Sequence, residues 1–543
     1  MRATGRAKEA GWLGAVSAVI ALLCLMPMLA VLVTALSGGT ETLVHLWDTV
    51  MPRYLMTTVV LVAIVALGTL VIGTTAAGLV VLTEFPGRRV IEVLLVLPLA
   101  FPAYVLAYAY THLLDHPGIV QSTLRAVTGW GPRDYWFPEI RSLGGAAAML
   151  TLVLYPYVYL LTRASLMGQS ASTYNAARAL GRTPIRAFVA VVLPLSRPAI
   201  AAGVLLATME TIADFGTVSY FGVQTFATGI YTSWFSLADR VAAAQLSLGL
   251  LVFALLLALL ERVSRRQARF HNGRRHEALP KTRLKGATRW LALAWCLVPV
   301  ILGFVIPVLA LVIMGIGSGQ DLLSDRYMRF LSNSLTLAAT ASVLTVIAAL
   351  VVGYFHRVRN SRYSAMLLHT GRLGYAVPGG VIAVGLLVPF AMFDNAFDAW
   401  MRDTFDISTG LLFTGSIWVL VMAYMIRFLA AAIGAYEGGQ AGINPNLDMA
   451  ARVLGRSSIG TLRSVYLPLL RPSLFTALLI VFVDVMKELP ATLIMRPFNF
   501  DTLAVQAHRL AADERLEGAA VPSLVIVAVG LLPVLLLIRR LRA

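Results

Sequence analysis

Two stretches of this chain repeat one another: Ala176-Ala177-Arg178-Ala179-Leu180-Gly181-Arg182 and Ala450-Ala451-Arg452-Val453-Leu454-Gly455-Arg456. A Leu-Pro pair follows each copy at the same distance, ending in Pro194 and in Pro468. The offset between the copies is constant, since 455 − 181 and 468 − 194 both equal 274. An earlier pair, Pro102 and Pro378, aligns at an offset of 276, so the duplication extends through most of each half of the chain.

The composition is that of a membrane protein. Of the 543 residues, 58% are hydrophobic and 13% are charged, with a mean hydropathy of +0.79. Soluble domains carry about 25% charged residues, so a bilayer is the solvent that this composition fits. The two cysteines, Cys24 and Cys296, lie in apolar runs. They indicate buried thiols, because two cysteines suffice for neither a disulfide framework nor a metal cluster.

The apolar runs predict an all-α integral membrane protein with about twelve spans. The first run is long enough to cross a bilayer, so we interpret it as an uncleaved helix in preference to a cleaved signal peptide. The twelve predicted spans cover residues 11–36, 55–83, 90–114, 143–167, 197–216, 241–261, 290–316, 331–355, 365–393, 410–435, 471–489 and 520–538.

Basic residues predict the orientation of these spans. The segment 262–289 holds ten Lys or Arg residues, and all basic clusters fall on one side if there are twelve spans. The opposite loops hold 11 basic and 16 acidic residues, a net charge of −5. Since Lys and Arg accumulate in cytoplasmic loops, we expect both termini in the cytoplasm. The net charge of +17 then reflects topology, and no nucleic-acid partner is expected.

Both copies of the motif fall in the same predicted compartment, so the halves are parallel repeats. We predict a first transmembrane half at 1–262, a basic cytoplasmic linker at 263–289 and a second transmembrane half at 290–543. Within each motif, Gly181 or Gly455 can turn the chain through a positive φ. We expect a short helix across the cytoplasmic ends of the spans, the alternative being a plain surface loop.

The pattern Ala-Ala-x-x-x-Gly followed by Leu-Pro resembles the cytoplasmic loop of binding-protein-dependent ABC importer permeases of the type I fold. The resemblance implies that these loops couple the chain to ATPase subunits, which bind the ATP and Mg²⁺. The family's usual Glu before the Ala pair is replaced by Asn175 and Met449. The matching positions are Ala176, Ala177, Arg178, Gly181, Arg182, Pro194, Ala450, Ala451, Arg452, Gly455, Arg456 and Pro468.

A narrower resemblance comes from residues 210–231 and from Lys487-Glu488-Leu489-Pro490-Ala491-Thr492 with residues 497–504. These stretches are similar to the fused ferric-iron permeases. That resemblance implies a bacterial inner-membrane protein that imports Fe³⁺ from a periplasmic binding protein, with a homodimer of ATPase subunits in the cytoplasm. Permeases for thiamine and other small polar solutes share the fold and the loop, and fold alone does not separate the solutes.

Four acidic residues lie within predicted spans: Glu210, Asp214, Asp484 and Glu488. Each pair is spaced four residues apart, on one helical face, and the pairs are related by the same offset of 274. Ionisable residues inside a membrane normally face a bundle interior or an aqueous path. One interpretation is a lining for a hard cation such as Fe³⁺, met transiently and without a tight metal site. The other is a structural ion network in which Lys487 neutralises Asp484 across the seam between the two halves.

The chain lacks the GxxxxGK[ST] phosphate loop, so we expect it to bind no ATP and no other cofactor. It also lacks HExxH and CxxC motifs, and we expect a transport permease with no enzymatic activity of its own. An intramembrane enzyme and a proton-driven secondary transporter are the rival classes. Duplication disfavours the enzyme, and activity without any ATPase would indicate the secondary transporter.

Overall fold

The computed structural model describes residues 2–169, 171–266, 280–321, 323–444 and 446–542. The chain divides into two compact units, each built from segments that are far apart in the sequence. Unit 1 contains residues 1–49, 229–252 and 321–506, and unit 2 contains residues 50–228, 253–320 and 507–543. Apart from one short strand pairing, the regular structure of the described residues is helical, which confirms the predicted all-α membrane fold.

Unit 2 is centred on three packed helices, α3 (Met51–Leu82), α7 (Leu143–Met167) and α10 (Leu193–Ala213). Its other helices are α4 (Arg88–Leu94), η1 (Leu97–Ala100), α5 (Ala103–Leu114), α6 (Ile119–Thr128), α8 (Ala171–Ala179), α9 (Pro184–Ala187), η2 (Phe188–Val192), α11 (Gly216–Tyr220), α14 (Ala287–Val300), η4 (Ile301–Val305), α15 (Ile306–Gly317) and α25 (Leu516–Arg542).

Unit 1 is centred on the equivalent trio, α16 (Asp325–Arg359), α19 (Trp418–Gln440) and α22 (Leu467–Met486). Its other helices are α1 (Arg2–Ser37), α2 (Gly39–Thr49), η3 (Thr232–Ser236), α17 (Arg362–Leu373), η5 (Gly374–Ala376), α18 (Gly379–Phe405), α20 (Asn446–Val453), α21 (Ser458–Thr461), η6 (Leu462–Tyr466) and α23 (Pro490–Met495). The unit boundaries fall within α12 (Phe226–Tyr231), α13 (Arg240–Arg266) and α24 (Leu503–Ala512).

The described residues contain eleven helices long and apolar enough to cross a membrane, or up to twelve if one bent pair counts as a span. The bent pair, Arg88–Ala100 with Ala103–Thr128, turns through 94° and corresponds to the predicted span 90–114. The predicted span 365–393 is also interrupted, and its membrane-length helix is Gly379–Phe405. The other predicted spans correspond to single candidate helices.

Both interruptions occur at a repeated proline. Pro102 has φ −68° and ψ 140°, and Pro378 has φ −57° and ψ 145°, so each is extended and starts the helix that follows it. Proline disfavours a helical conformation at the preceding residue and has no N–H to donate. The repeat pairs these two prolines, but the sequence pattern did not predict that each one breaks a membrane span.

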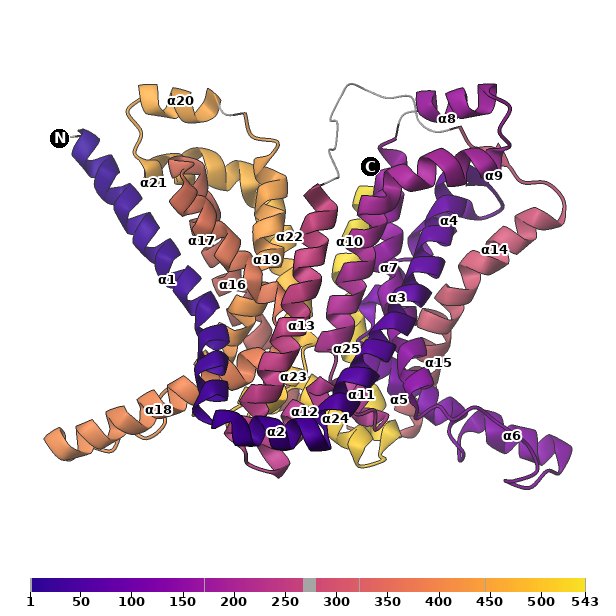
Figure 1. Ribbon diagram of the computed structural model, residues 1–543, viewed down its shortest axis with the longest axis horizontal. Coiled ribbons are helices and arrows are strands. Elements are labelled where there is room, and N and C mark those ends of the chain that lie inside the picture. The colour runs from indigo at the N-terminus through magenta and orange to yellow at the C-terminus, as the bar shows by residue number, and fades with distance from the viewer. Residues whose placement is uncertain (1, 170, 267–279, 322, 445, 543) are drawn as a thin grey trace. The chain divides into compact units, whose positions relative to one another are not determined.

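Each unit combines helices from both halves of the sequence. Helix α1 packs on α16, α17 and α18, which belong to the second half of the sequence (Figure 1). Conversely, α14 packs on α4, and α15 packs on α5 and α25, all within unit 2. Sequence similarity identifies equivalent residues and does not say which helices pack together. The domain boundaries at 262 and 290 follow the repeat and stay a prediction.

The linker is described only at its two ends, and residues 267–279 of the predicted basic segment lie outside the described residues. Strand β2 (Thr282–Arg283) pairs in parallel with β1 (Thr83–Glu84), which directly follows α3. The Leu284 N–H also donates to the Glu84 carbonyl at 3.1 Å. The end of the linker is therefore fixed to unit 2 by backbone hydrogen bonds.

Candidate functional site

Each copy of the repeated motif forms a short helix that ends in a glycine turn. In the first copy, α8 is followed by Gly181 at φ +81°, and the Arg182 N–H donates to the Ala177 carbonyl at 3.2 Å. In the second, α20 is followed by Gly455 at φ +73°, and the Arg456 N–H donates to the Ala451 carbonyl at 3.0 Å. This is the 6→1 hydrogen bond of a Schellman motif, which needs a left-handed residue at its turn. The predicted helix and glycine turn are present in both halves.

The two alanines of each motif face in opposite directions. Ala177 and Ala451 are buried against their own units, while Ala176 and Ala450 are exposed. The exposed tip of each helix is apolar, since Leu180 is 84% exposed and the equivalent Leu454 is 78% exposed. In Figure 1, each helix runs crosswise to the long helices of its own unit, beyond their ends. Each unit thus carries an exposed leucine at the equivalent place beside its glycine turn.

The arginines of the motif surround the glycine turn. Arg178 is exposed and donates from its guanidinium to the Arg182 carbonyl, which closes the turn. Arg182 and Arg456 are exposed as well. A surface cleft of about 480 Å³ adjoins the first copy and is lined by Leu180, Gly181, Arg182, Arg186, Val189 and Ala190. The side chain of Arg452 lies outside the described residues, so its predicted role has no structural account.

Pro194 and Pro468 do not begin separate helices. Each sits in the first turn of a helix that continues from a π-helical turn, η2 before Pro194 and η6 before Pro468. The Leu193 N–H donates five residues back to Phe188, and the Leu467 N–H does the same to Leu462. A proline inside a helix has no N–H and crowds the carbonyl four residues back. The widened turn accommodates it, so the helix bends without ending.

Asp214 and Glu488 make the same structural contact in the two halves. Asp214 follows α10, and its Oδ1 accepts from the backbone N–H groups of Thr217 at 3.0 Å and Val218 at 3.2 Å. The Asp214 Oδ2 accepts from the Thr217 hydroxyl at 3.0 Å. These bonds satisfy the first N–H groups of α11, which no helical carbonyl can reach.

Glu488 follows α22 and stabilises the start of α23 in the same way. Its Oε1 accepts from the Ala491 N–H at 3.0 Å, and its Oε2 accepts from the Thr492 N–H at 3.1 Å and the Thr492 hydroxyl at 2.8 Å. Arg427 of α19 adds a charged partner, with its guanidinium 3.0 Å from the Glu488 Oε1. The structural interpretation of these acids therefore has direct support at Asp214 and Glu488.

Glu210 and Asp484 lie one helical turn before these caps, on α10 and α22, and both are partly exposed. The Asp484 carboxylate pairs with Lys487 of its own unit at 2.9 Å. The predicted neutralisation by Lys487 thus occurs locally, at the end of one helix. Whether any of the four predicted path residues meets a solute stays a prediction.

Arg141 forms a cluster near the predicted outer ends of the unit 2 helices. Its Nε lies 2.9 Å from the Asp115 carboxylate, and its terminal nitrogens lie 2.6 Å and 2.8 Å from the two Glu514 oxygens. Its guanidinium also lies 5.2 Å from the centre of the Tyr220 ring, at the end of α11. The hydrogen bond from Arg141 lowers the pKa of the Glu514 carboxyl. The cluster joins the segment before α7 to α11 and to the loop before α25.

Sequence reasoning missed two ion pairs, Glu92 with Arg163, which is largely buried, and Arg372 with Glu437, which is partly exposed. Arg163 and Glu437 are equivalent in the repeat, because 437 − 163 equals 274. Their charges are opposite, so a search for identical residues passes over them. A search for charged positions at the repeat offset, whatever their sign, would have found them. No group of three or more His, Cys, Asp and Glu residues that could hold a metal occurs in the described part of the chain.

Residues 69–269 and 341–543 each match the family described as "Binding-protein-dependent transport system inner membrane component". The chain belongs to this family. The two matches cover most of the permease and place one copy in each half, which confirms the fused two-half form. The family match and the membrane-length helices make it a multi-span inner-membrane component of an ABC transporter, a transport permease.

Two of the relatives align with nearly the whole length of the permease. It is 27% identical over 536 residues to "Fe(3+)-transport system permease protein FbpB 2" of Haemophilus influenzae, covering 97% of each chain. It is 25% identical to "Probable ABC transporter permease protein y4fN" of Sinorhizobium fredii, covering 91% of the permease and 89% of that protein. A putative 2-aminoethylphosphonate transport permease, PhnU of Salmonella choleraesuis, is 27% identical and matches 45% of the permease but 88% of its own length. The fused architecture is therefore shared with the ferric-iron relative.

Proposed function

We propose that this permease imports ferric iron, received from a periplasmic binding protein and driven by a homodimer of cytoplasmic ATPase subunits. The observation that carries the ATP-driven function is the pair of equivalent helices, α8 and α20, each with an exposed apolar tip closed by a left-handed glycine. Two matching tips suit two identical partner subunits. The ferric-iron relative, matched over 97% of both chains, supports Fe³⁺ as the solute.

The proposed orientation places α8, α20 and both termini in the cytoplasm. It requires twelve crossings, so the bent pair Arg88–Ala100 with Ala103–Thr128 must count as one span. The basic segment 262–289 supports this orientation, because Lys and Arg accumulate in cytoplasmic loops. The Arg141 cluster and the acidic outer loops then face the periplasm, where a binding protein would dock.

ATP binding and hydrolysis in the partner subunits would displace α8 and α20, and each short helix would move the long helices to which it is joined. Helix α8 lies between α7 and α10 along the chain, and α20 lies between α19 and α22. Displacement of α10 and α22 would also move α11 and α23, since Asp214 and Glu488 join each pair by hydrogen bonds. The caps therefore transmit motion from the long helices to the short ones.

We assign the solute path to Glu210 and Asp484, whose side chains are partly exposed, and a structural role to Asp214 and Glu488. Carboxylate oxygens are hard ligands that suit a hard, highly charged cation. The described residues offer no cluster that could hold a metal tightly. Transient contact is what a conducting path requires, because a solute that binds tightly is not released.

The test is uptake by proteoliposomes that contain the permease, a candidate pair of ATPase subunits and a candidate periplasmic binding protein. We expect uptake of radiolabelled Fe³⁺ that requires enclosed ATP and all three components. Uptake that persists without the ATPase would contradict the proposal and indicate a secondary transporter. ATP-dependent uptake of thiamine or 2-aminoethylphosphonate, with none of Fe³⁺, would retain the ATP-driven mechanism and overturn the assignment of iron.

A further inference from the structure

Each half has an ion pair between the same two helices, with the charges reversed. Arg163 and Glu437 match at the repeat offset of 274, whereas their partners Glu92 and Arg372 lie 280 residues apart. In unit 2, Arg163 of α7 pairs with Glu92 of α4, and in unit 1, Glu437 of α19 pairs with Arg372 of α17. Helices α4 and α17 are the ones that precede the breaks at Pro102 and Pro378. Each half therefore has a charged bridge between the same two helices, although the Arg and the Glu have exchanged helices.

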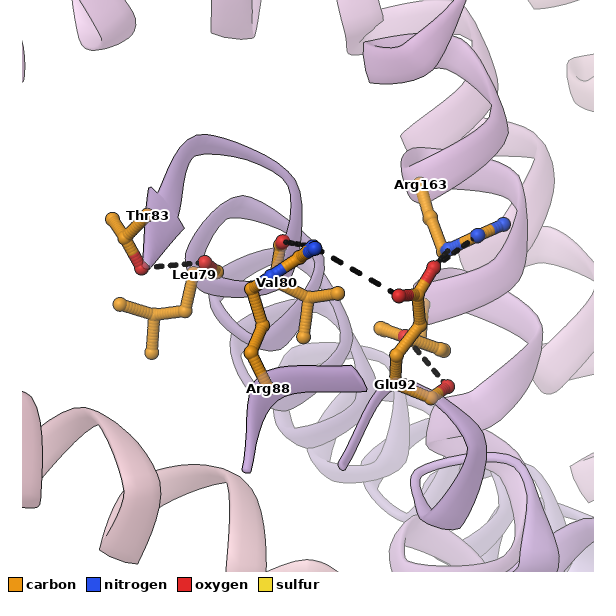
Figure 2. Close-up of polar contacts among 7 residues, drawn as sticks. Leu79, Val80, Thr83, Arg88, Glu92 and Arg163 are labelled. Carbon is orange, nitrogen blue, oxygen red and sulfur yellow. Dashed lines mark hydrogen bonds and ion pairs between the residues drawn. The ribbon is translucent and has the colours of Figure 1, made fainter. Parts of the chain in front are cut away.

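The first bridge is the more buried. The Arg163 Nε lies 2.8 Å from the Glu92 Oε1, and a second guanidinium nitrogen contacts the same oxygen. The Arg163 side chain is only 6% exposed and that of Glu92 is 19% exposed. Figure 2 shows Glu92 between Arg163 and Arg88, whose own guanidinium donates to the Val80 carbonyl at 2.8 Å. Charge-assisted hydrogen bonds in such a setting are strong and directional.

Both bridges lie just before the short exposed helices. Arg163 is four residues from Met167, where α7 ends, and α8 begins at Ala171. Glu437 is three residues from Gln440, where α19 ends, and α20 begins at Asn446. At about 1.5 Å per residue, each bridge is within roughly 6 Å of the helix end from which the exposed helix departs.

Contacts also join the two ends of each exposed loop. They are hydrogen bonds in unit 2 and apolar contacts in unit 1. In unit 2, the Gln169 amide donates to the Val192 carbonyl at 3.1 Å and to the Ser196 hydroxyl at 2.8 Å. The equivalent residues in unit 1 are Ile443 and Leu470, which are buried in one apolar cluster. Because both loops are closed at the base, α8 and α20 are each held to the ends of their flanking helices.

We propose that the Glu92–Arg163 and Arg372–Glu437 bridges carry the displacement of α8 and α20 into α4 and α17, and so to the proline breaks that follow. They are positioning residues for the coupling of ATP hydrolysis to transport, and this inference rests on the proposed ATP-driven function. The cation lies on α7 in one half and on α17 in the other, so the bridge is present in both halves although both of its residues differ. The presence of an ion pair in both halves indicates that the contact between the two helices is what matters. Which of the two helices carries the arginine does not.

The experiment measures solute transported per ATP hydrolysed in the reconstituted complex of permease, ATPase and binding protein. In unit 1, Arg372→Glu and Glu437→Arg are made singly and together. In unit 2, the double change Glu92→Gln with Arg163→Met removes both charges of the bridge, while Arg88 keeps its hydrogen bond to the Val80 carbonyl. Amount in the membrane and co-purification of the ATPase are recorded for every variant.

We expect each single variant and the neutral double variant to lower the transport-to-hydrolysis ratio by about fivefold or more. The exchanged pair, Arg372→Glu with Glu437→Arg, should restore the ratio, which a general loss of stability would not allow. A ratio unchanged in the neutral double variant, or a failure of the exchanged pair to recover it, would overturn the inference. A wild-type complex without ATP-dependent transport would instead overturn the proposed function.

Discussion

Asp214 and Glu488 are related by the repeat offset of 274, and each carboxylate accepts hydrogen bonds from the backbone N–H groups three and four residues ahead. The contacts are the same although one residue is Asp and the other is Glu. Their partners differ in one respect, because only Glu488 has an arginine of α19, Arg427, bonded to its carboxylate. The two caps should therefore differ in what their removal costs.

Replacing these caps should destabilise the permease to different extents. Asp214→Ala removes the cap of α11 and should lower the free energy of unfolding by about 1–2 kcal/mol. Glu488→Ala also leaves the Arg427 guanidinium, whose side chain is 14% exposed, without its partner. That loss should be about 3–5 kcal/mol. Thermal unfolding in detergent measures both, with Asp484→Asn as the matched control on a partly exposed carboxylate. Equal losses at the two caps would contradict this account of Arg427.

Changes at the glycine turns should impair coupling while leaving the bundle intact. Gly181→Val and Gly455→Val force a β-branched residue into a left-handed conformation, at a cost of about 1–2 kcal/mol or more confined to the short loop. We expect loss of ATPase co-purification with normal membrane insertion. Gly434→Ala is the control, because this helical glycine of α19 has open space around it and should be nearly neutral. Retained ATPase binding and transport in the double variant would exclude a docking role for α8 and α20.

Acid should weaken the Arg141 cluster. The hydrogen bond from Arg141 lowers the pKa of the Glu514 carboxyl. The stability that the Arg141–Glu514 interaction gives to the folded protein is therefore fully present above the usual Glu pKa, and it is lost as the pH falls through the lowered pKa. Limited proteolysis of the 115–141 segment should therefore increase below about pH 4. Glu514→Gln should flatten this dependence, while Asp513→Asn should leave it intact. A variant with the wild-type pH profile would exclude Glu514 as the responsible group.

The solute path is tested by removing charge where the side chains are partly exposed. Glu210→Gln combined with Asp484→Asn should lower Fe³⁺ uptake by about tenfold or more, because a polar lining without charge attracts a trivalent cation less strongly. Uptake is compared at equal amounts of inserted protein. Asp403→Asn, at an exposed position near the C-terminal end of α18, is the control. A normal rate in the double variant would remove these two carboxylates from the path.

Much of this fold could be predicted from the sequence because its dominant constraint is simple. Apolar length predicts spans such as Leu143–Met167, and the offset of 274 predicts which elements are equivalent. The bends at Pro102 and Pro378 were not predicted, since a proline can either kink a span or end it. The packing of α1 with second-half helices was also not predicted, because similarity between halves carries no information about which surfaces meet.

Those features of the candidate site that need one particular residue type could be predicted from the sequence. Gly181 and Gly455 were found because a left-handed turn favours glycine, and both adopt it. The bridges at Arg163 and Glu437 were missed because opposite charges do not align as similar residues. The capping roles of Asp214 and Glu488 depend on where each chain turns after its long helix. That turn is a property of the fold and leaves little trace in the local sequence.

The most direct test of the central claim is the side of the membrane on which the two glycine turns lie. Arg182→Cys and Arg456→Cys place one exposed thiol at each turn, on a background where Cys24 and Cys296 are buried. We predict that an impermeant maleimide labels both positions in inside-out vesicles and neither in intact spheroplasts. Labelling of the two positions from opposite sides would contradict the account, because one cytoplasmic pair of ATPase subunits could not contact both.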